Sequence, residues 1–105
     1  MVQDNVFIDK LIENATNYLK KQNYSDSSIK KYLRYWWQLK EHWRSCYISI
    51  SDYDECLYLM KQQWKIPDST KITDNQRFRL RTVKCLFDLL TTGSFLKYHS
   101  IISEN

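Results

Sequence analysis

Only one glycine and one proline interrupt the 105 residues of this chain. A domain built from several strands needs frequent turns, and glycine and proline are among the residues that form them. Long helices need few such residues. Hydrophobic residues make up 43% of the chain and aromatic residues 15%, which is enough to bury one core and argues against disorder. We therefore predict a single all-α domain over residues 1–105, a compact bundle of four or five helices.

Apolar residues recur at intervals of three and four in four segments, which is the spacing of an amphipathic helix. These segments predict helices over about residues 4–21, 25–44, 51–64 and 73–93. Residues that can cap a first turn stand at each start: Asp4 or Asn5, the serines of 25–28, Ser51 or Asp52, and Thr73 or Asp74. Gly93 is expected to end the last helix in a left-handed C-cap. Residues 46–51 are expected to form an extended connection, and residues 94–105 a linker or a short terminal helix.

The net charge of +4 is distributed unevenly along the chain. Residues 25–48 carry five bases against two acids, and residues 61–81 carry six bases against two acids. Residues 49–60, which lie between these two basic stretches, carry three acids and no base. The third predicted helix should therefore lie away from any nucleic acid. The excess positive charge thus lies on two predicted helices, and such an excess is what a phosphate-facing surface needs. Solvated helix faces would give the same pattern, so charge alone leaves both interpretations open.

The predicted helix at residues 25–44 separates an apolar side from a polar one. Its apolar side should pack in the core, including its aromatic residues: Ile29, Tyr32, Leu33, Trp36, Leu39 and Trp43. Its outward residues include Lys30, Lys31, Arg34, Tyr35 and Gln38. In the helix at residues 73–93, Arg77, Arg81 and Lys84 form an outward basic stripe. Arg79 falls nearer the apolar side and should extend to solvent or pair with an acid.

The remaining chemistry points away from an enzyme, a cofactor site or a membrane protein. Cys46, Cys56 and Cys85 are odd in number and lack CxxC spacing, which indicates small buried residues in a reducing cytoplasm. No apolar run approaches the ~18 residues of a membrane span. His42 and Cys46 lie one helical turn apart without further ligands, so we expect no metal. Nothing places a nucleophile beside a base, and one glycine cannot form a phosphate-binding loop.

Two motifs resemble a known family. The first opens the predicted second helix with Ser25-Asp-Ser-Ser28-Ile29-Lys-Lys-Tyr32, and the second runs from Arg79-Leu-Arg81 through Leu86-Phe-Asp88 to Gly93. Together, over about residues 7–96, they resemble the N-terminal, SAM-like helical DNA-binding domain of tyrosine recombinases, the integrases of phages and mobile elements. The resemblance implies four or five packed helices that, with a catalytic domain, clamp a DNA duplex and place two helices in the major groove.

The resemblance also implies a set of functional residues and partners. By position, the DNA-binding candidates are Lys30, Lys31, Arg34, Tyr35, Gln38, Arg77, Arg81, Thr82 and Lys84. The implied partners are double-stranded DNA, other protomers on that DNA and, if the chain is a fragment, a downstream catalytic domain. The H-x-x-R spacing of the recombinase active site is absent, so we do not expect this chain itself to be an enzyme. A helical protein–protein interaction module, with Tyr35, Trp37 and Phe78 at its docking edge, and a free-standing regulator of a mobile element are the alternatives.

Overall fold

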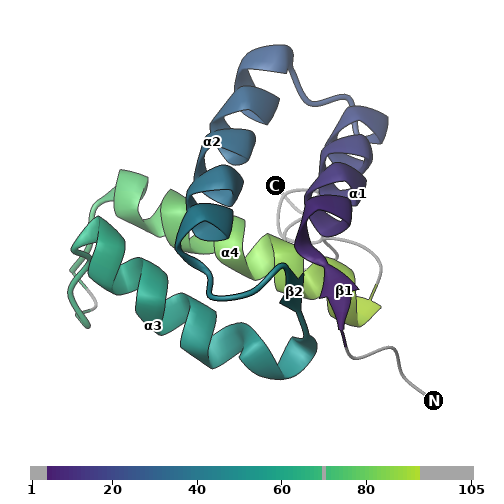
Figure 1. Ribbon diagram of the computed structural model, residues 1–105. Helices are drawn as coiled ribbons and strands as arrows, with labels where there is room; N and C mark the ends of the chain where they lie inside the picture. Colours follow the sequence, from purple (N-terminus) through teal and green to yellow (C-terminus); the bar gives the residue numbers. More distant parts are fainter. Residues whose placement is uncertain (1–4, 70, 93–105) are drawn as a thin grey trace.

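A computed structural model describes residues 5–69 and 71–92 of the chain, and it confirms the all-α prediction (Figure 1). Two short strands and a 3-10 turn accompany the helices in the described part. The elements are β1 (Val6–Phe7), α1 (Ile8–Lys21), α2 (Asp26–His42), β2 (Tyr47–Ile48), the 3-10 turn (Ile50–Asp52), α3 (Tyr53–Trp64) and α4 (Asp74–Thr92). Helices α1 and α2 form one pair, and α4 packs against each of the other three helices. Helix α2 also packs against the other three helices, so α2 and α4 together form the centre of the bundle.

Local capping explains where α2 and α4 begin. The Ser25 hydroxyl accepts a hydrogen bond from the Ser28 amide at 3.2 Å, so the predicted serine cap of α2 is confirmed. Before α4, the Gln76 amide donates to the Thr73 hydroxyl at 3.0 Å, and the Thr73 amide donates to the Gln76 side-chain oxygen at 2.9 Å. This reciprocal pair is a capping box, which satisfies two otherwise unpaired amides.

The starts of α1 and α3 differ from the prediction. Helix α1 begins only at Ile8, after Phe7, which provides no side-chain cap, so the predicted start near residue 4 is wrong. The cause is the pairing of Val6–Phe7 with Tyr47–Ile48, which holds this segment extended. Asp52 does precede α3, but its carboxylate accepts a bond from the Ser49 amide at 2.9 Å and caps the 3-10 turn instead. The glycine C-cap predicted at residue 93 and the terminal segment 94–105 lie outside the described residues.

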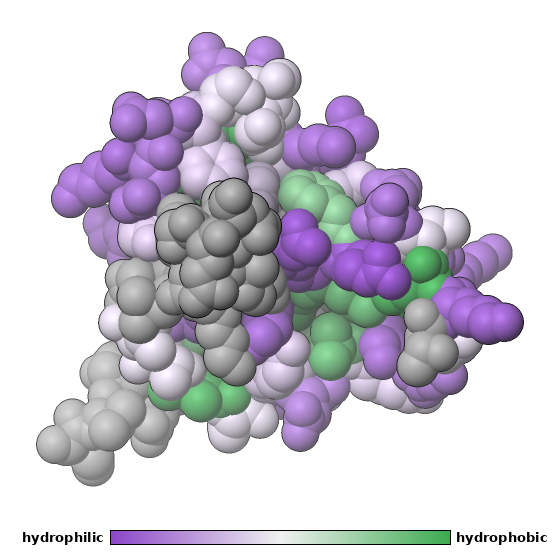
Figure 2. All heavy atoms as spheres, turned by 180° about the vertical axis from the view of Figure 1, so that it is seen from behind, coloured by the Kyte–Doolittle hydropathy of each residue, from purple (hydrophilic) through white to green (hydrophobic). Residues whose placement is uncertain are grey.

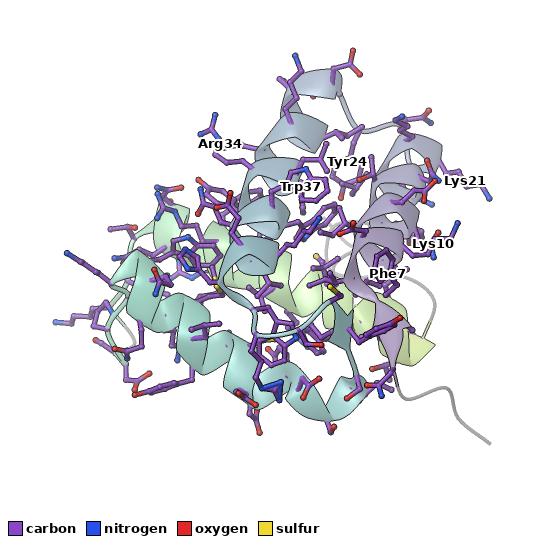
Figure 3. All side chains as sticks on the ribbon, in the orientation of Figure 1. Phe7, Lys10, Lys21, Tyr24, Arg34 and Trp37 are labelled. Carbon is purple, nitrogen blue, oxygen red and sulfur yellow. The ribbon has the colours of Figure 1, made fainter. Side chains whose placement is uncertain are left out.

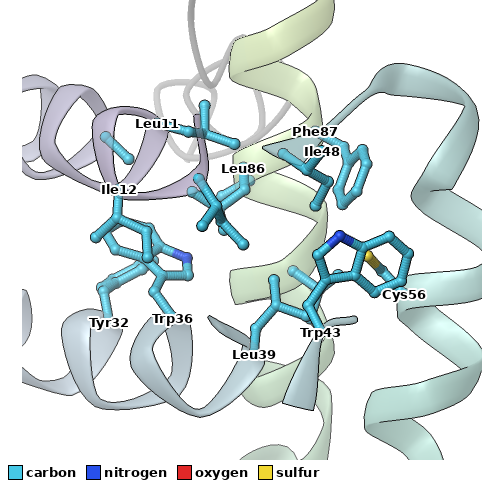
Figure 4. Close-up of a cluster of buried hydrophobic side chains, with 14 of the residues drawn as sticks. Leu11, Ile12, Tyr32, Trp36, Leu39, Trp43, Ile48, Cys56, Leu86 and Phe87 are labelled. Atoms are coloured by element: carbon cyan, nitrogen blue, oxygen red, sulfur yellow. The ribbon is translucent and has the colours of Figure 1, made fainter. Parts of the chain in front are cut away.

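Trp36 occupies the centre of the core, with none of its surface exposed. Figure 4 shows it with Ile12 of α1 and Leu86 of α4, in a cluster that also includes Ile48 of β2. Its indole nitrogen donates a hydrogen bond of 2.8 Å to the Thr82 carbonyl oxygen, which satisfies a buried donor. The predicted apolar side of α2 is confirmed, with the difference that Leu33 is only half-buried.

The three cysteines are all free thiols, and they fall into two classes. Cys56 and Cys85 are buried as predicted, and burial raises the pKa of each thiol to about 12. Cys46 is exposed, so its predicted burial is wrong. The physical reason is that residues 43–46 leave the helix before β2, and Cys46 contributes its carbonyl oxygen, not its side chain, to the contact with Ile8.

This division predicts the reactivity of the thiols in the native protein. At about pH 8, a thiol reagent should modify Cys46 rapidly, because the thiolate is the reactive form and only this thiol is accessible. Cys56 and Cys85 should react only after the protein is unfolded in denaturant. The measurement is the time course of thiol modification, and Cys46→Ser should remove the rapid phase. Equal rates for all three thiols in native buffer would contradict the described packing.

Candidate nucleic-acid interface

The exposed side of α4 carries three basic residues at spacings of four and three: Arg77, Arg81 and Lys84, called here the α4 stripe. Arg77 is exposed, and the other two are half-buried. Two members pair within the helix: Arg77 lies 3.0 Å from Asp74, and Lys84 lies 3.4 Å from Asp88. Figure 2, seen from behind, shows strongly hydrophilic side chains beside apolar ones on this face of the molecule. The predicted outward orientation is confirmed for Arg77, whereas Arg81 and Lys84 are only partly exposed.

A hollow between α2 and α4 brings Lys31 to the α4 stripe. It is lined by Lys31, Asp74, Asn75, Arg77, Phe78 and Arg81, and it is called here the α2–α4 hollow. The Lys31 ammonium lies 5.0 Å from the centre of the Phe78 ring, a cation–π distance. Phe78 in turn packs edge-on against Tyr32 of the core, with ring centres 5.0 Å apart. Core packing therefore holds an α2 lysine beside the arginines of α4.

A second hollow lies on the other side of the α4 stripe, between α3 and α4. It is lined by Tyr53, Leu57, Lys61, Arg77, Leu80, Arg81 and Lys84, and it is called here the α3–α4 hollow. The α4 stripe therefore forms a ridge between two hollows, with a lysine from a neighbouring helix in each. The sequence did not indicate Lys61 as a site residue, because the three acids at the start of its helix predict that this helix lies away from nucleic acid. The excess of bases over residues 61–81 was the signal that included it.

Of the other α2 candidates, some are exposed and some make contacts inside the protein. Lys30 and Arg34 are exposed as predicted, and Figure 3 shows Arg34 pointing outward on the side of α2 away from α1. Gln38 is half-buried, and its side-chain oxygen accepts a 2.6 Å hydrogen bond from the Trp64 indole of α3. The prediction of a fully outward Gln38 is therefore wrong. Its amide oxygen joins two helices and is not available to read a base.

Tyr35 is the clearest correction on α2, because only 5% of it is exposed. Its ring packs edge-on against Trp64, at 5.6 Å between centres, and against Phe78 at 5.9 Å. The guanidinium carbon of Arg79 lies 5.1 Å from the Tyr35 ring and 5.9 Å from the Trp64 ring. Arg79 is therefore held by aromatic faces, where the sequence suggested solvent or an acidic partner. Tyr35 belongs to the junction of α2, α3 and α4 and is excluded from the surface.

Thr82 is likewise removed from the candidate surface, because its exposed fraction is 0%. Its hydroxyl donates a 2.6 Å hydrogen bond to the Arg79 carbonyl oxygen, and its own carbonyl oxygen accepts the bond from Trp36. Both polar groups of this residue are thus used inside the protein. The prediction that Thr82 faces DNA is wrong for this reason.

Two tyrosines near the α4 stripe stay neutral at ordinary pH. Burial raises the pKa of Tyr53, and nearby Lys84 opposes this rise only in part. Burial also raises the pKa of Tyr32, a core residue that packs against Phe78 of the α2–α4 hollow. A protonated phenol adds no negative charge and can donate a hydrogen bond. These tyrosines therefore do not oppose the binding of an anion at this face.

The fold and the site together define the chain as a small all-α bundle with a basic ridge on α4. Neither a family model, nor a curated protein, nor a solved structure matches this chain. Within residues 5–69 and 71–92, no group of three or more histidine, cysteine or acidic side chains is placed to hold a metal ion. In the same residues, no helix is long and apolar enough to cross a membrane.

Proposed function

We propose that this chain is a DNA-binding module that presents the α4 stripe to the phosphates of a duplex. The observation that carries the proposal is the meeting of Arg77 and Arg81 with Lys31 of α2 around one hollow, and with Lys84 around the neighbouring hollow. Lysine and arginine side chains position a protein on DNA through its phosphates. The major groove, about 12 Å wide, admits a single α-helix. A helix whose open side carries a basic stripe, with a second cation beside it, is suited to this form of binding.

Acidic residues reduce the charge of this face without removing it. Lys31, Lys61 and the α4 stripe supply five positive charges. Three acids pair with members of this set: Asp68 with Lys61, Asp74 with Arg77 and Asp88 with Lys84. Five less three leaves a charge of +2. The acids of the Lys61 and Arg77 pairs are exposed, and ion pairs at exposed sites contribute only about 0–1 kcal/mol each, so phosphates can compete with Asp68 and Asp74 for these cations.

The more specific form of the proposal is the DNA-binding domain of an integrase of the tyrosine-recombinase type, which binds a recombination site. Its support is the two motifs in the sequence, whose conspicuous residues serve the fold: Ser25 caps α2, and Ile29 and Leu86 are buried. In this form, catalysis belongs to a separate domain, and protomers contact one another on DNA. A free-standing regulator of a mobile element would use the same DNA-binding face without such a domain.

A protein–protein interaction module is the second candidate function. Of the three residues expected at its docking edge, Tyr35 is buried and Phe78 is half-buried, so Trp37, with 43% of its surface exposed, is what supports it. Phe7 and Tyr47 add an exposed aromatic pair, with ring centres 5.7 Å apart. This candidate predicts little dependence of DNA affinity on the α4 stripe.

The salt dependence of duplex binding tests the proposed function. If Lys31, Arg77, Arg81 and Lys84 each neutralise one phosphate, the logarithm of the association constant should fall with the logarithm of salt concentration with a slope of about −3.6, or about −0.9 for each phosphate. Fluorescence anisotropy of a labelled duplex, titrated at several salt concentrations, gives this slope. An absence of duplex binding at low salt, or a flat salt response, would contradict the proposal.

A further inference from the structure

We infer that Lys61 and Tyr53 of α3 form a second phosphate-binding edge of the same interface, on the side of α4 opposite Lys31. This inference rests on the proposed function. It assigns a binding role to a helix whose acidic start argues against one. The two residues share the α3–α4 hollow with all three members of the α4 stripe.

The arrangement of the two hollows suits the symmetry of a duplex groove. A helix in the major groove lies between two sugar–phosphate backbones. Lys31 stands in the hollow on the α2 side of the α4 stripe, and Lys61 stands in the hollow on the α3 side. With α4 between the backbones, Lys31 faces the phosphates of one strand and Lys61 faces those of the other. Contacts of this kind fix the orientation of a helix without reading the sequence.

The chemistry of the α3–α4 hollow fits a phosphate and its sugar. The Lys61 side chain is 26% exposed, so its stem is largely covered while its ammonium reaches Asp68 at 2.8 Å. The Tyr53 ring packs against Phe87, at 5.0 Å between centres, which limits its movement, and its protonated hydroxyl is a hydrogen-bond donor. Leu57 and Leu80 supply apolar surface between these polar groups.

The carboxylate of Asp68 is an anionic group that already contacts the Lys61 ammonium. Its side chain is 84% exposed, so this ion pair is open to solvent and contributes little to stability. A phosphate oxygen can take the place of the carboxylate oxygen on the Lys61 ammonium, since both form charge-assisted hydrogen bonds. Asp68 thus competes with the phosphate for the Lys61 ammonium, and removing the Asp68 charge should strengthen duplex binding.

The test compares Lys61→Gln with Lys10→Gln in duplex binding. Lys10 is a matched control, because it is an exposed lysine paired with an acid, Glu13 at 3.6 Å, and Figure 3 places it on α1. Loss of one phosphate contact should weaken binding about eightfold at about 0.1 M salt and make the salt slope less negative by about 0.9. The loss should be the same on two duplexes of unrelated sequence, as expected of a phosphate contact. Lys10→Gln should bind like the unchanged protein.

The remaining outcomes distinguish a failure of the α3 edge from a failure of the proposed function. If the unchanged protein binds duplex and Lys61→Gln binds as Lys10→Gln does, the α3 edge is wrong and the proposed function stands. If the unchanged protein binds no duplex, the proposed function fails and the α3 edge fails with it. If Lys61→Gln lowers the thermal midpoint, the duplex affinity of Asp68→Asn tests the α3 edge in its place. Tighter binding than that of Glu13→Gln, in which an exposed acid paired with Lys10 on α1 is neutralised, supports the edge, and equal or weaker binding overturns it.

Discussion

Replacing Trp36 with alanine is expected to lower the free energy of unfolding by about 3–5 kcal/mol, the range for truncation of a large aromatic residue in a core. Trp36 is fully buried, so its removal leaves a cavity among α1, α2 and α4. The change also removes the donor that pairs with the Thr82 carbonyl oxygen. Since small domains have a total stability of about 5–15 kcal/mol, this loss is a large fraction of it.

Trp37→Ala is the matched control, because it makes the same chemical change one residue along the chain. Trp37 is 43% exposed, and the Lys40 ammonium lies 4.7 Å from the centre of its ring. Its truncation should cost less than about 1 kcal/mol, as is usual for surface changes. Urea unfolding followed by far-UV circular dichroism measures both variants. Similar losses for the two would mean that α2 is rotated about its axis relative to the described structure.

Replacing all three residues of the α4 stripe with glutamine should weaken duplex binding by about 500-fold at about 0.1 M salt, which is three losses of about eightfold each. The salt slope should become less negative by about 2.7, since three counterions fewer are released. The physical reason is that glutamine keeps a polar side chain of similar length and removes only the charge. Anisotropy titrations at several salt concentrations measure both quantities, and the thermal midpoint checks that the triple variant is folded.

The control is a second triple variant with the same change of net charge, Lys10→Gln, Lys20→Gln and Lys21→Gln. All three lysines are exposed on α1, and Figure 3 shows Lys10 and Lys21 on the side of α1 away from α2. This variant should bind duplex nearly as tightly as the unchanged protein, because exposed charges more than a Debye length of about 10 Å from the phosphates are screened. Equal weakening by both triples would show that net charge, not the α4 stripe, controls binding.

The features that could be predicted from the sequence depend on residues a few positions apart. The serine cap of α2 and the Thr73–Gln76 capping box involve partners three residues away. The apolar side of α2 and the basic stripe of α4 follow from helical spacing, which the backbone hydrogen bonds impose on any helix. The two-strand pairing could not be predicted in this way, because it joins Val6–Phe7 to Tyr47–Ile48, about forty residues along the chain.

The incorrect site residues share one physical cause. A helical wheel assigns one buried face to a helix, whereas α2 packs against α1, α3 and α4. The buried arc of α2 is therefore wider than one face, and it includes Tyr35 and part of Gln38. Thr82 is buried for a related reason, since α4 is covered by three helices.

The sequence by itself determined the helical class, the starts of α2 and α4, the burial of Trp36 and the alignment of Arg77, Arg81 and Lys84 along one side of α4. Each of these follows from interactions within one helix or from the number of apolar residues. Only the tertiary structure decided that Lys31 and Lys61 lie on opposite sides of that stripe. The physical reason is that neighbouring helices are oriented by the packing of the core, in which Trp36, Phe78 and Phe87 meet residues far away in the sequence.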